Sequence, residues 1–136
     1  MKTLVVNLFG GPGAGKSALA YGIMWWLKVH DIKCEFVQEY AKGKFYEESH
    51  KTLDVQEYVF GKQLLHTTRC LGKVEVIITD APLIHSIIYD SGKDQDFRRL
   101  VKKKHDNLNT LNIFLTRNHP YDPVGRYQDE AGGKVA

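Results

Sequence analysis

Residues 10–17 read Gly10-Gly11-Pro12-Gly13-Ala14-Gly15-Lys16-Ser17 and fit the pattern G-x-x-x-x-G-K-S/T at every required position. The run Thr3–Phe9 before them is short, apolar and partly β-branched, which is typical of a parallel strand covered on both faces. Apolar residues recur at helical spacing after them, so we expect a helix over about Lys16–Val29. A glycine-rich loop therefore joins a buried strand to a helix.

Each part of this loop has a physical role in binding a polyphosphate. Its glycines allow main-chain torsions that point successive N–H groups at a phosphate, and the start of the following helix adds a partial positive charge. Lys16 would lie between the β- and γ-phosphates, and the Ser17 hydroxyl would bind Mg²⁺. A chance match in a chain of this length has odds on the order of one per cent or less. We interpret the loop as a site for ATP and Mg²⁺, formed by Gly11, Pro12, Gly13, Ala14, Gly15, Lys16, Ser17 and Ala18.

Strands and helices are expected to alternate along the rest of the chain. Further strands are predicted at Lys33–Gln38, Val74–Thr79 and Leu111–Thr116, and further helices at Thr52–Leu71, before Gly72, and at Asp94–Asp106. Such alternation predicts an α/β fold with three layers and a parallel sheet. The carboxyl ends of parallel strands open onto one edge. That edge would gather the Gly10 loop, Glu39, Asp80 and Arg117.

The composition bounds the class of protein. The chain has 136 residues, enough for a single domain, and 43% of them are hydrophobic, so a disordered or fibrous protein is excluded. A net charge of +3 is far below what nucleic-acid binding requires. Cys34 and Cys70 lack a zinc-ligand spacing and are expected to be reduced packing residues. No apolar stretch has the length of a membrane span, so we expect no membrane partner and a cytoplasmic location.

Two carboxylates follow predicted strands. Asp80 ends the third strand, where a carboxylate lies beside the phosphate loop and holds Mg²⁺ directly or through water. Its alternative role is to cap a following helix that Pro82 would open. Glu39 ends the second strand and suits the orientation or deprotonation of an acceptor hydroxyl. Its alternative is an exposed loop residue.

Four more side chains are candidates for substrate or phosphate contacts. Tyr40 and Gln63 could stack on and hydrogen-bond to a heterocycle, with ordinary packing as the alternative. Arg117 and Arg126 flank a Pro- and Gly-rich loop, where guanidinium groups would neutralise charge on the γ-phosphate. A solvated surface position is the alternative for each arginine. Residues 117–136 are polar and are predicted to form a lid or tail.

Taken together, GGPGAGKS, QEYAK, VIITDAPL and FLTRNHPYDPVGR resemble the small P-loop ATP-binding proteins and kinases found in phage genomes. These are similar to the ribosylnicotinamide kinase domain of the bacterial NAD-biosynthesis regulator. The resemblance implies a P-loop NTPase fold with strand order 2-3-1-4. It also implies Glu39 as general base, Asp80 as Mg²⁺ ligand, and Arg117 and Arg126 as lid arginines. Those relatives continue into another helix and often a fifth strand, which this chain is expected to lack.

The sequence therefore predicts an ATP- and Mg²⁺-dependent kinase for a nucleoside, nucleotide or similar small metabolite. Lys16, Glu39, Asp80, Arg117 and Arg126 would be its catalytic residues, and a phage-encoded chain would act in the host cytoplasm. The alternative is an ATP-binding or ATPase module that drives a protein partner. A nucleic-acid-processing protein is a weaker option because of the small net charge. The acceptor and the oligomeric state are left open.

Overall fold

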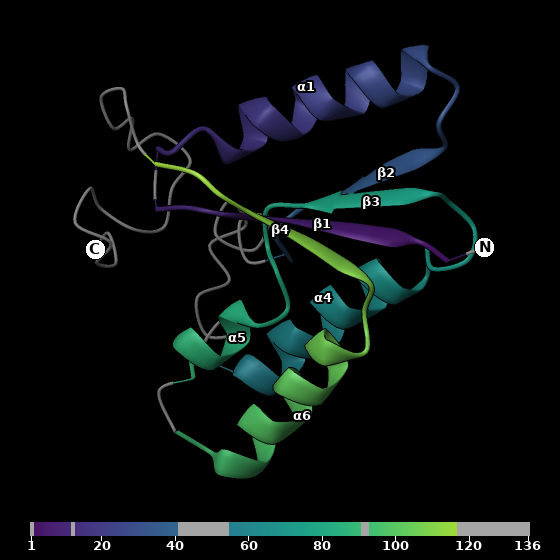
Figure 1. Cartoon of the computed structure of the whole chain (residues 1–136). Helices are drawn as coiled ribbons and strands as arrows, with labels where there is room; N and C mark the ends of the chain where they lie inside the picture. Colours follow the sequence, from purple (N-terminus) through teal and green to yellow (C-terminus); the bar gives the residue numbers. More distant parts are fainter. Residues whose placement is uncertain (1, 12, 41–54, 91–92, 117–136) are drawn as a thin grey trace.

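Four parallel strands form the centre of the protein in a computed structural model that describes residues 2–11, 13–40, 55–90 and 93–116 (Figure 1). The strands are β1 Leu4–Phe9, β2 Cys34–Val37, β3 Val76–Thr79 and β4 Thr110–Phe114. They lie in the order β2-β3-β1-β4, and each neighbouring pair is parallel. This confirms the predicted α/β class and the strand order 2-3-1-4. Each strand is shorter than predicted, and β4 begins one residue earlier and ends two residues earlier than expected.

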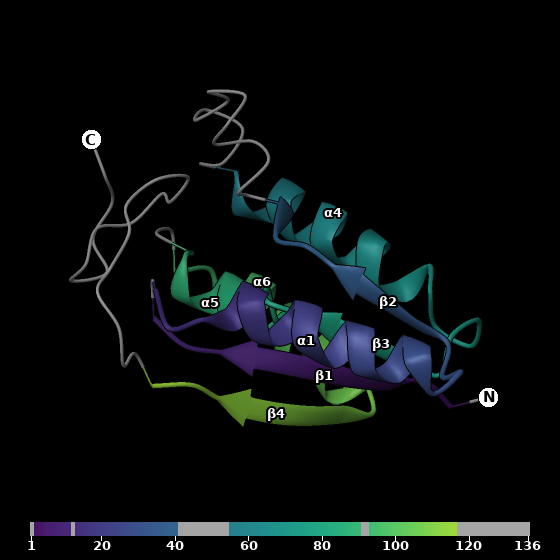
Figure 2. The same cartoon turned by 90° about the horizontal axis from the view of Figure 1, so that it is seen from above.

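Helices cover both faces of the sheet, which gives the three layers that were expected. Helix α1, Lys16–Val29, lies over one face, and α4 Gln56–Thr68, α5 His85–Ile88 and α6 Gln95–Asp106 lie on the other (Figures 1 and 2). The predicted helix Thr52–Leu71 was too long, because α4 ends at Thr68 and the chain then turns; residues 52–54 lie outside the described part. Gly72, with φ +77°, lies in that turn.

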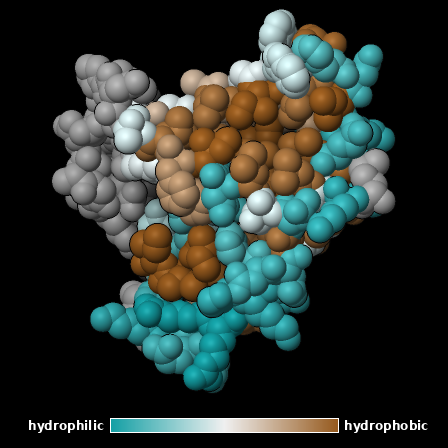
Figure 3. Space-filling view, in the orientation of Figure 1, coloured by the Kyte–Doolittle hydropathy of each residue, from teal (hydrophilic) through white to brown (hydrophobic). Residues whose placement is uncertain are grey.

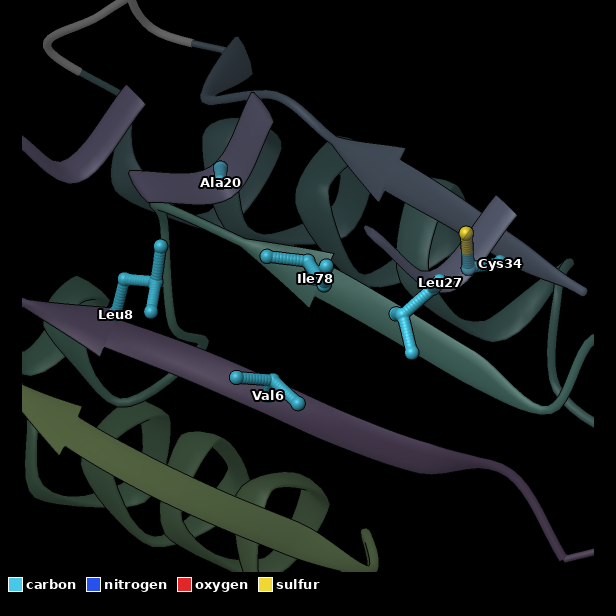
Figure 4. Packing of buried hydrophobic residues seen from close by; sticks show 6 residues of the cluster. All are labelled: Val6, Leu8, Ala20, Leu27, Cys34 and Ile78. Atoms are coloured by element: carbon cyan, nitrogen blue, oxygen red, sulfur yellow. The ribbon is translucent and has the colours of Figure 1, made fainter. Parts of the chain in front are cut away.

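The alternation of side chains along β1 builds a core on each side of the sheet. Val6 and Leu8 face α1 and pack with Ala20, Leu27, Cys34 and Ile78 (Figure 4). Val5 belongs to a separate cluster on the opposite face. On that face a further cluster consists of Phe60 from α4, Leu83 from the segment before α5, and Phe97 and Val101 from α6. Because β1 is buried on both faces, its sequence does not alternate between apolar and polar residues. Its one polar residue, Asn7, is buried and donates from Nδ2 to Asn112 Oδ1 at 3.0 Å.

Surface exposure differs from expectation on α1. Leu19, Ile23, Trp26 and Leu27 share helical spacing, which predicts that they face the core. Trp26 departs from this prediction, because it is 51% exposed, and its neighbour Trp25 is 67% exposed. The prediction is confirmed for Leu27, which is buried in the core, and Leu19 and Ile23 are partly buried against it. Apolar side chains also gather on the surface along α1 and the neighbouring sheet edge at β4 (Figure 3). Cys34 and Cys70 are both free.

Candidate functional site

The loop between β1 and α1 has a main chain suited to an anion. Gly13 and Gly15 adopt φ values of 76° and 95°, in the left-handed region that favours glycine. The N–H of Ala14 donates to the carbonyl of Gly11 at 3.2 Å, which closes a turn. Gly15 is the N-cap of α1, and no side chain in the described residues caps this helix. Its first N–H groups are thus left for an outside acceptor, and they fit a phosphate.

Gly10 shows why the loop begins with a glycine. A Cβ at this position would lie 2.9 Å from the Ala14 Cβ and 3.2 Å from the Leu115 carbonyl oxygen. Leu115 is fixed beside β1, because its N–H donates to the Phe9 carbonyl at 2.8 Å. The loop is therefore packed between its own turn and the chain that follows β4. At Gly11, by contrast, a Cβ would meet nothing within 4 Å.

The ends of β2 and β3 are joined by the side chain of Asp80. Asp80 is 8% exposed, and its Oδ1 accepts a hydrogen bond from the N–H of Glu39 at 3.1 Å. The two predicted carboxylate residues therefore meet, as parallel topology required. The alternative helix-capping role of Asp80 is wrong, because the N-cap of α5 is Ile84. Thr79 adds a second link, since its buried hydroxyl donates to the Val37 carbonyl at 2.8 Å.

Tyr40 and Gln63 also meet, but through the main chain of Tyr40. The N–H of Tyr40 donates to Gln63 Oε1 at 2.9 Å, and Gln63 Nε2 donates to the Gln38 carbonyl at 3.3 Å. The Tyr40 ring lies edge-on to Tyr58 and His66, with centroids 6.0 Å away in each case. A heterocycle could use only the second donor and lone pair of the Gln63 amide. The binding of a heterocycle by Tyr40 and Gln63 stays a prediction.

His85 is a site residue that the sequence did not single out. Its ring packs edge-on against Phe9, the last residue of β1, with centroids 5.1 Å apart. Burial, followed by the charges of Lys16 and His105, lowers the pKa of His85 from 6.5 to about 4. His85 is therefore a neutral imidazole within the electrostatic reach of Lys16. No spacing signal could have found it, because that proximity depends on where α5 lies.

Of the remaining predicted site residues, some lie in the described part of the chain and others outside it. Lys16 and Ser17 begin α1, both partly buried, and Ala18 is exposed. Pro12, Arg117 and Arg126, and the whole predicted lid at 117–136, lie outside the described residues.

A Mg²⁺ site formed by Ser17 and Asp80 would need phosphate and water oxygens to complete it. This suits an ion that keeps several waters, and within the described ranges no three or more His, Cys, Asp or Glu residues form a metal-binding group. The chemistry of these two oxygen donors fits a magnesium-bound triphosphate. Among the helices of these same ranges, none has both the length and the apolar character needed to cross a membrane.

Comparison with known proteins places the fold. No protein-family model and no curated protein matches the sequence. The APS kinase CysC of Mycobacterium tuberculosis superposes with a TM-score of 0.56 at 15% identity, over 90% of this chain and 82% of the kinase chain. The chain has a P-loop kinase fold. A second structure, of the protein APE1195, has a TM-score of 0.48 at 19% identity, over 83% of this chain and 60% of that one. At 15% identity, the likeness to the APS kinase is one of fold.

Proposed function

We propose that the protein is an ATP- and Mg²⁺-dependent phosphotransferase for a nucleoside, a nucleotide or a similar small metabolite. The observation that carries the proposal is the hydrogen bond between Asp80 and the main chain of Glu39. Strand β3 is the neighbour of β1, with Asn7 opposite Thr79, so Asp80 leaves the sheet on the same edge as the glycine-rich loop. Asp80 thus lies where a metal-bound phosphate is expected, and Glu39 follows β2, the strand next to β3.

Each residue then has a role in phosphoryl transfer. The loop amides and Lys16 bind the β- and γ-phosphates, and Ser17 and Asp80 hold Mg²⁺, which neutralises phosphate charge when bound. Glu39 orients the acceptor hydroxyl and takes its proton. Arg117 and Arg126 contact the transferring phosphate and help to exclude water. A simple ATPase activates a water, whereas a kinase must orient an acceptor hydroxyl, and a carboxylate at the end of a neighbouring strand suits that second task. The paired strand ends therefore favour a kinase.

The fold comparison and the sequence motifs support the same class of enzyme. One of the structures that superpose over most of the chain is an APS kinase. The motifs further suggest a phage-type chain, similar to the ribosylnicotinamide kinase domain and active in a host cytoplasm. No residue set specific for nicotinamide is present, so the acceptor is sought among nucleosides and nucleotides generally.

The test is ATP consumption with Mg²⁺, measured with and without a panel of nucleosides and nucleoside monophosphates. We expect one acceptor to stimulate consumption and to appear as a phosphorylated product. Steady hydrolysis that no acceptor changes would instead identify an ATPase that serves a protein partner. Absence of Mg²⁺–ATP binding by calorimetry would refute both.

Two variants with matched controls assign the roles. Lys16→Ala should lower transfer by orders of magnitude, whereas Lys103→Ala, on the exposed face of α6, should leave it unchanged. Glu39→Gln should lose transfer and keep Mg²⁺–ATP binding, and Glu35→Gln, on the exposed side of β2, is its control. Full transfer by Glu39→Gln would remove Glu39 from the mechanism, and loss of ATP binding would move it to the nucleotide site.

A further inference from the structure

The main chain on both sides of Glu39 is held by one side chain. Gln63, on α4, donates from Nε2 to the carbonyl of Gln38 at 3.3 Å and accepts at Oε1 from the N–H of Tyr40 at 2.9 Å. These two groups belong to the residues immediately before and after Glu39. The N–H of Glu39 itself donates to Asp80 Oδ1 at 3.1 Å. Three successive residues thus have a main-chain group fixed by a side chain, from Gln63 on α4 or from Asp80 directly after β3.

Because the Gln63 side chain is buried, its amide depends on these two hydrogen bonds. Gln63 is only 6% exposed, and a buried amide costs about 1–3 kcal/mol when its hydrogen bonds are unmade. One glutamine satisfies both ends of its amide by spanning Gln38 and Tyr40, so the chain between them has one favoured position. A shorter or apolar side chain at this position cannot do so. Thr67, one turn along α4, is also buried, but its hydroxyl bonds within the helix, to the Gln63 carbonyl at 3.0 Å.

We propose that Gln63 is a positioning residue for Glu39: its amide fixes the flanking main chain, so that the acceptor-orienting carboxylate is held at the end of β2 beside Asp80. The inference rests on the proposed function and deepens it. It assigns Gln63 a contact with the protein's own main chain in place of the predicted contact with a heterocycle. Asp80 then serves twice, as a candidate metal ligand and as the anchor of Glu39, and α4 becomes part of the transfer site.

The test compares Gln63→Met, which is similar in length and lacks the amide, with Thr68→Val. The control also loses one side-chain hydrogen bond on α4, from Thr68 Oγ1 to the Leu64 carbonyl at 2.8 Å, but that bond lies within the helix. If Gln63→Met does not fold, Gln63→Asn, one methylene shorter, replaces it. Each variant is assayed for Mg²⁺–ATP affinity by calorimetry, for kcat and KM with the best acceptor of the panel, and for amide exchange by ¹⁵N NMR.

Gln63→Met should lower kcat by about 10- to 100-fold, because a misplaced orienting group costs this much. Mg²⁺–ATP affinity should not change, since the phosphate loop is left intact. Exchange at the Tyr40 amide should accelerate by about tenfold, as expected for the loss of one hydrogen bond. Thr68→Val should change neither kcat nor the exchange rate of the Tyr40 amide. An unchanged kcat, or faster exchange throughout α4 in both variants alike, would overturn the proposal.

Failure of the proposed function is separable from failure of this inference. If the wild-type chain transfers phosphate to no acceptor, the kinase assignment falls. The exchange measurement still decides whether Gln63 holds the Glu39 segment: local acceleration at Tyr40 supports that part, and unchanged exchange refutes it.

Discussion

Replacement of Gly10 by alanine tests the close packing at the start of the glycine-rich loop. The new Cβ would lie 2.9 Å from the Ala14 Cβ and 3.2 Å from the Leu115 carbonyl oxygen. Carbon atoms pack best at about 3.5–4.0 Å, so the first contact is short by about 0.6 Å or more. Neither neighbour is the end of a flexible side chain. The main chain of the loop, or of the segment after β4, must therefore shift.

Overpacking of this kind costs about 1–3 kcal/mol. The entropy of unfolding is about 2.1 cal/mol/K per residue, so for 136 residues each kcal/mol lowers Tm by about 3–4 °C. We therefore expect Gly10→Ala to lower Tm by about 4–10 °C. Gly11→Ala is the matched control, because its Cβ would meet nothing within 4 Å. Its stability should stay within about 0.5 kcal/mol of wild type.

Thermal and urea unfolding of the single variants and of Gly10→Ala in an Ala14→Gly background measure these effects. Removal of the Ala14 methyl group abolishes the shortest contact, so Gly10→Ala should cost about 0.5–2 kcal/mol less in that background. Two results would refute the reasoning: a Gly10→Ala variant as stable as Gly11→Ala, or an equal cost of Gly10→Ala in both backgrounds. Either would mean that the loop is not wedged between its own turn and the chain after β4.

Three further predictions concern other contacts of the site and its supports. The folded protein keeps His85 neutral to about pH 4, whereas the unfolded chain protonates it near 6.5, so unfolding takes up a proton between these values. The free energy of unfolding should therefore be unaffected by His85 protonation above pH 6.5 and should fall by about 2–3 kcal/mol towards pH 4. Urea unfolding measured across this pH range should not show that loss in His85→Gln. The Asp94 side chain caps α6, so Asp94→Ala should cost about 1 kcal/mol and Asp94→Asn almost nothing; equal costs for the two would contradict the cap. Thr79 is buried and its hydroxyl bonds the Val37 carbonyl at 2.8 Å, so Thr79→Val should cost about 1–3 kcal/mol by thermal unfolding, with Thr79→Ser milder. A Thr79→Val variant as stable as wild type would mean that this link between β2 and β3 contributes nothing.

Features set by neighbouring residues could be predicted from the sequence. The glycine-rich loop is one, because left-handed torsions at Gly13 and Gly15 depend on residues that lack a Cβ. Helix α1 was predicted with its correct bounds, and Asp94 was placed correctly at the start of α6. The end of α4 was missed, because its apolar spacing continues to Leu71 while the main chain already turns after Thr68. Trp26 and Leu27 both fit the helical spacing of core residues, but only Leu27 is buried, while Trp26 is 51% exposed.

Contacts between distant segments depended on the tertiary structure. That β2 and β3 end at one edge follows from parallel topology, but the bond from the Glu39 N–H to Asp80, across 41 residues of chain, depends on strand register and on the direction of one side chain. The Gln63 amide reaches Tyr40 across 23 residues, and only the packing of α4 brings it there. In the same way, the position of α5 brings His85 under the electrostatic influence of Lys16. A local pattern specifies torsions and burial along one element, whereas hydrogen-bond partners are chosen when separate elements pack together.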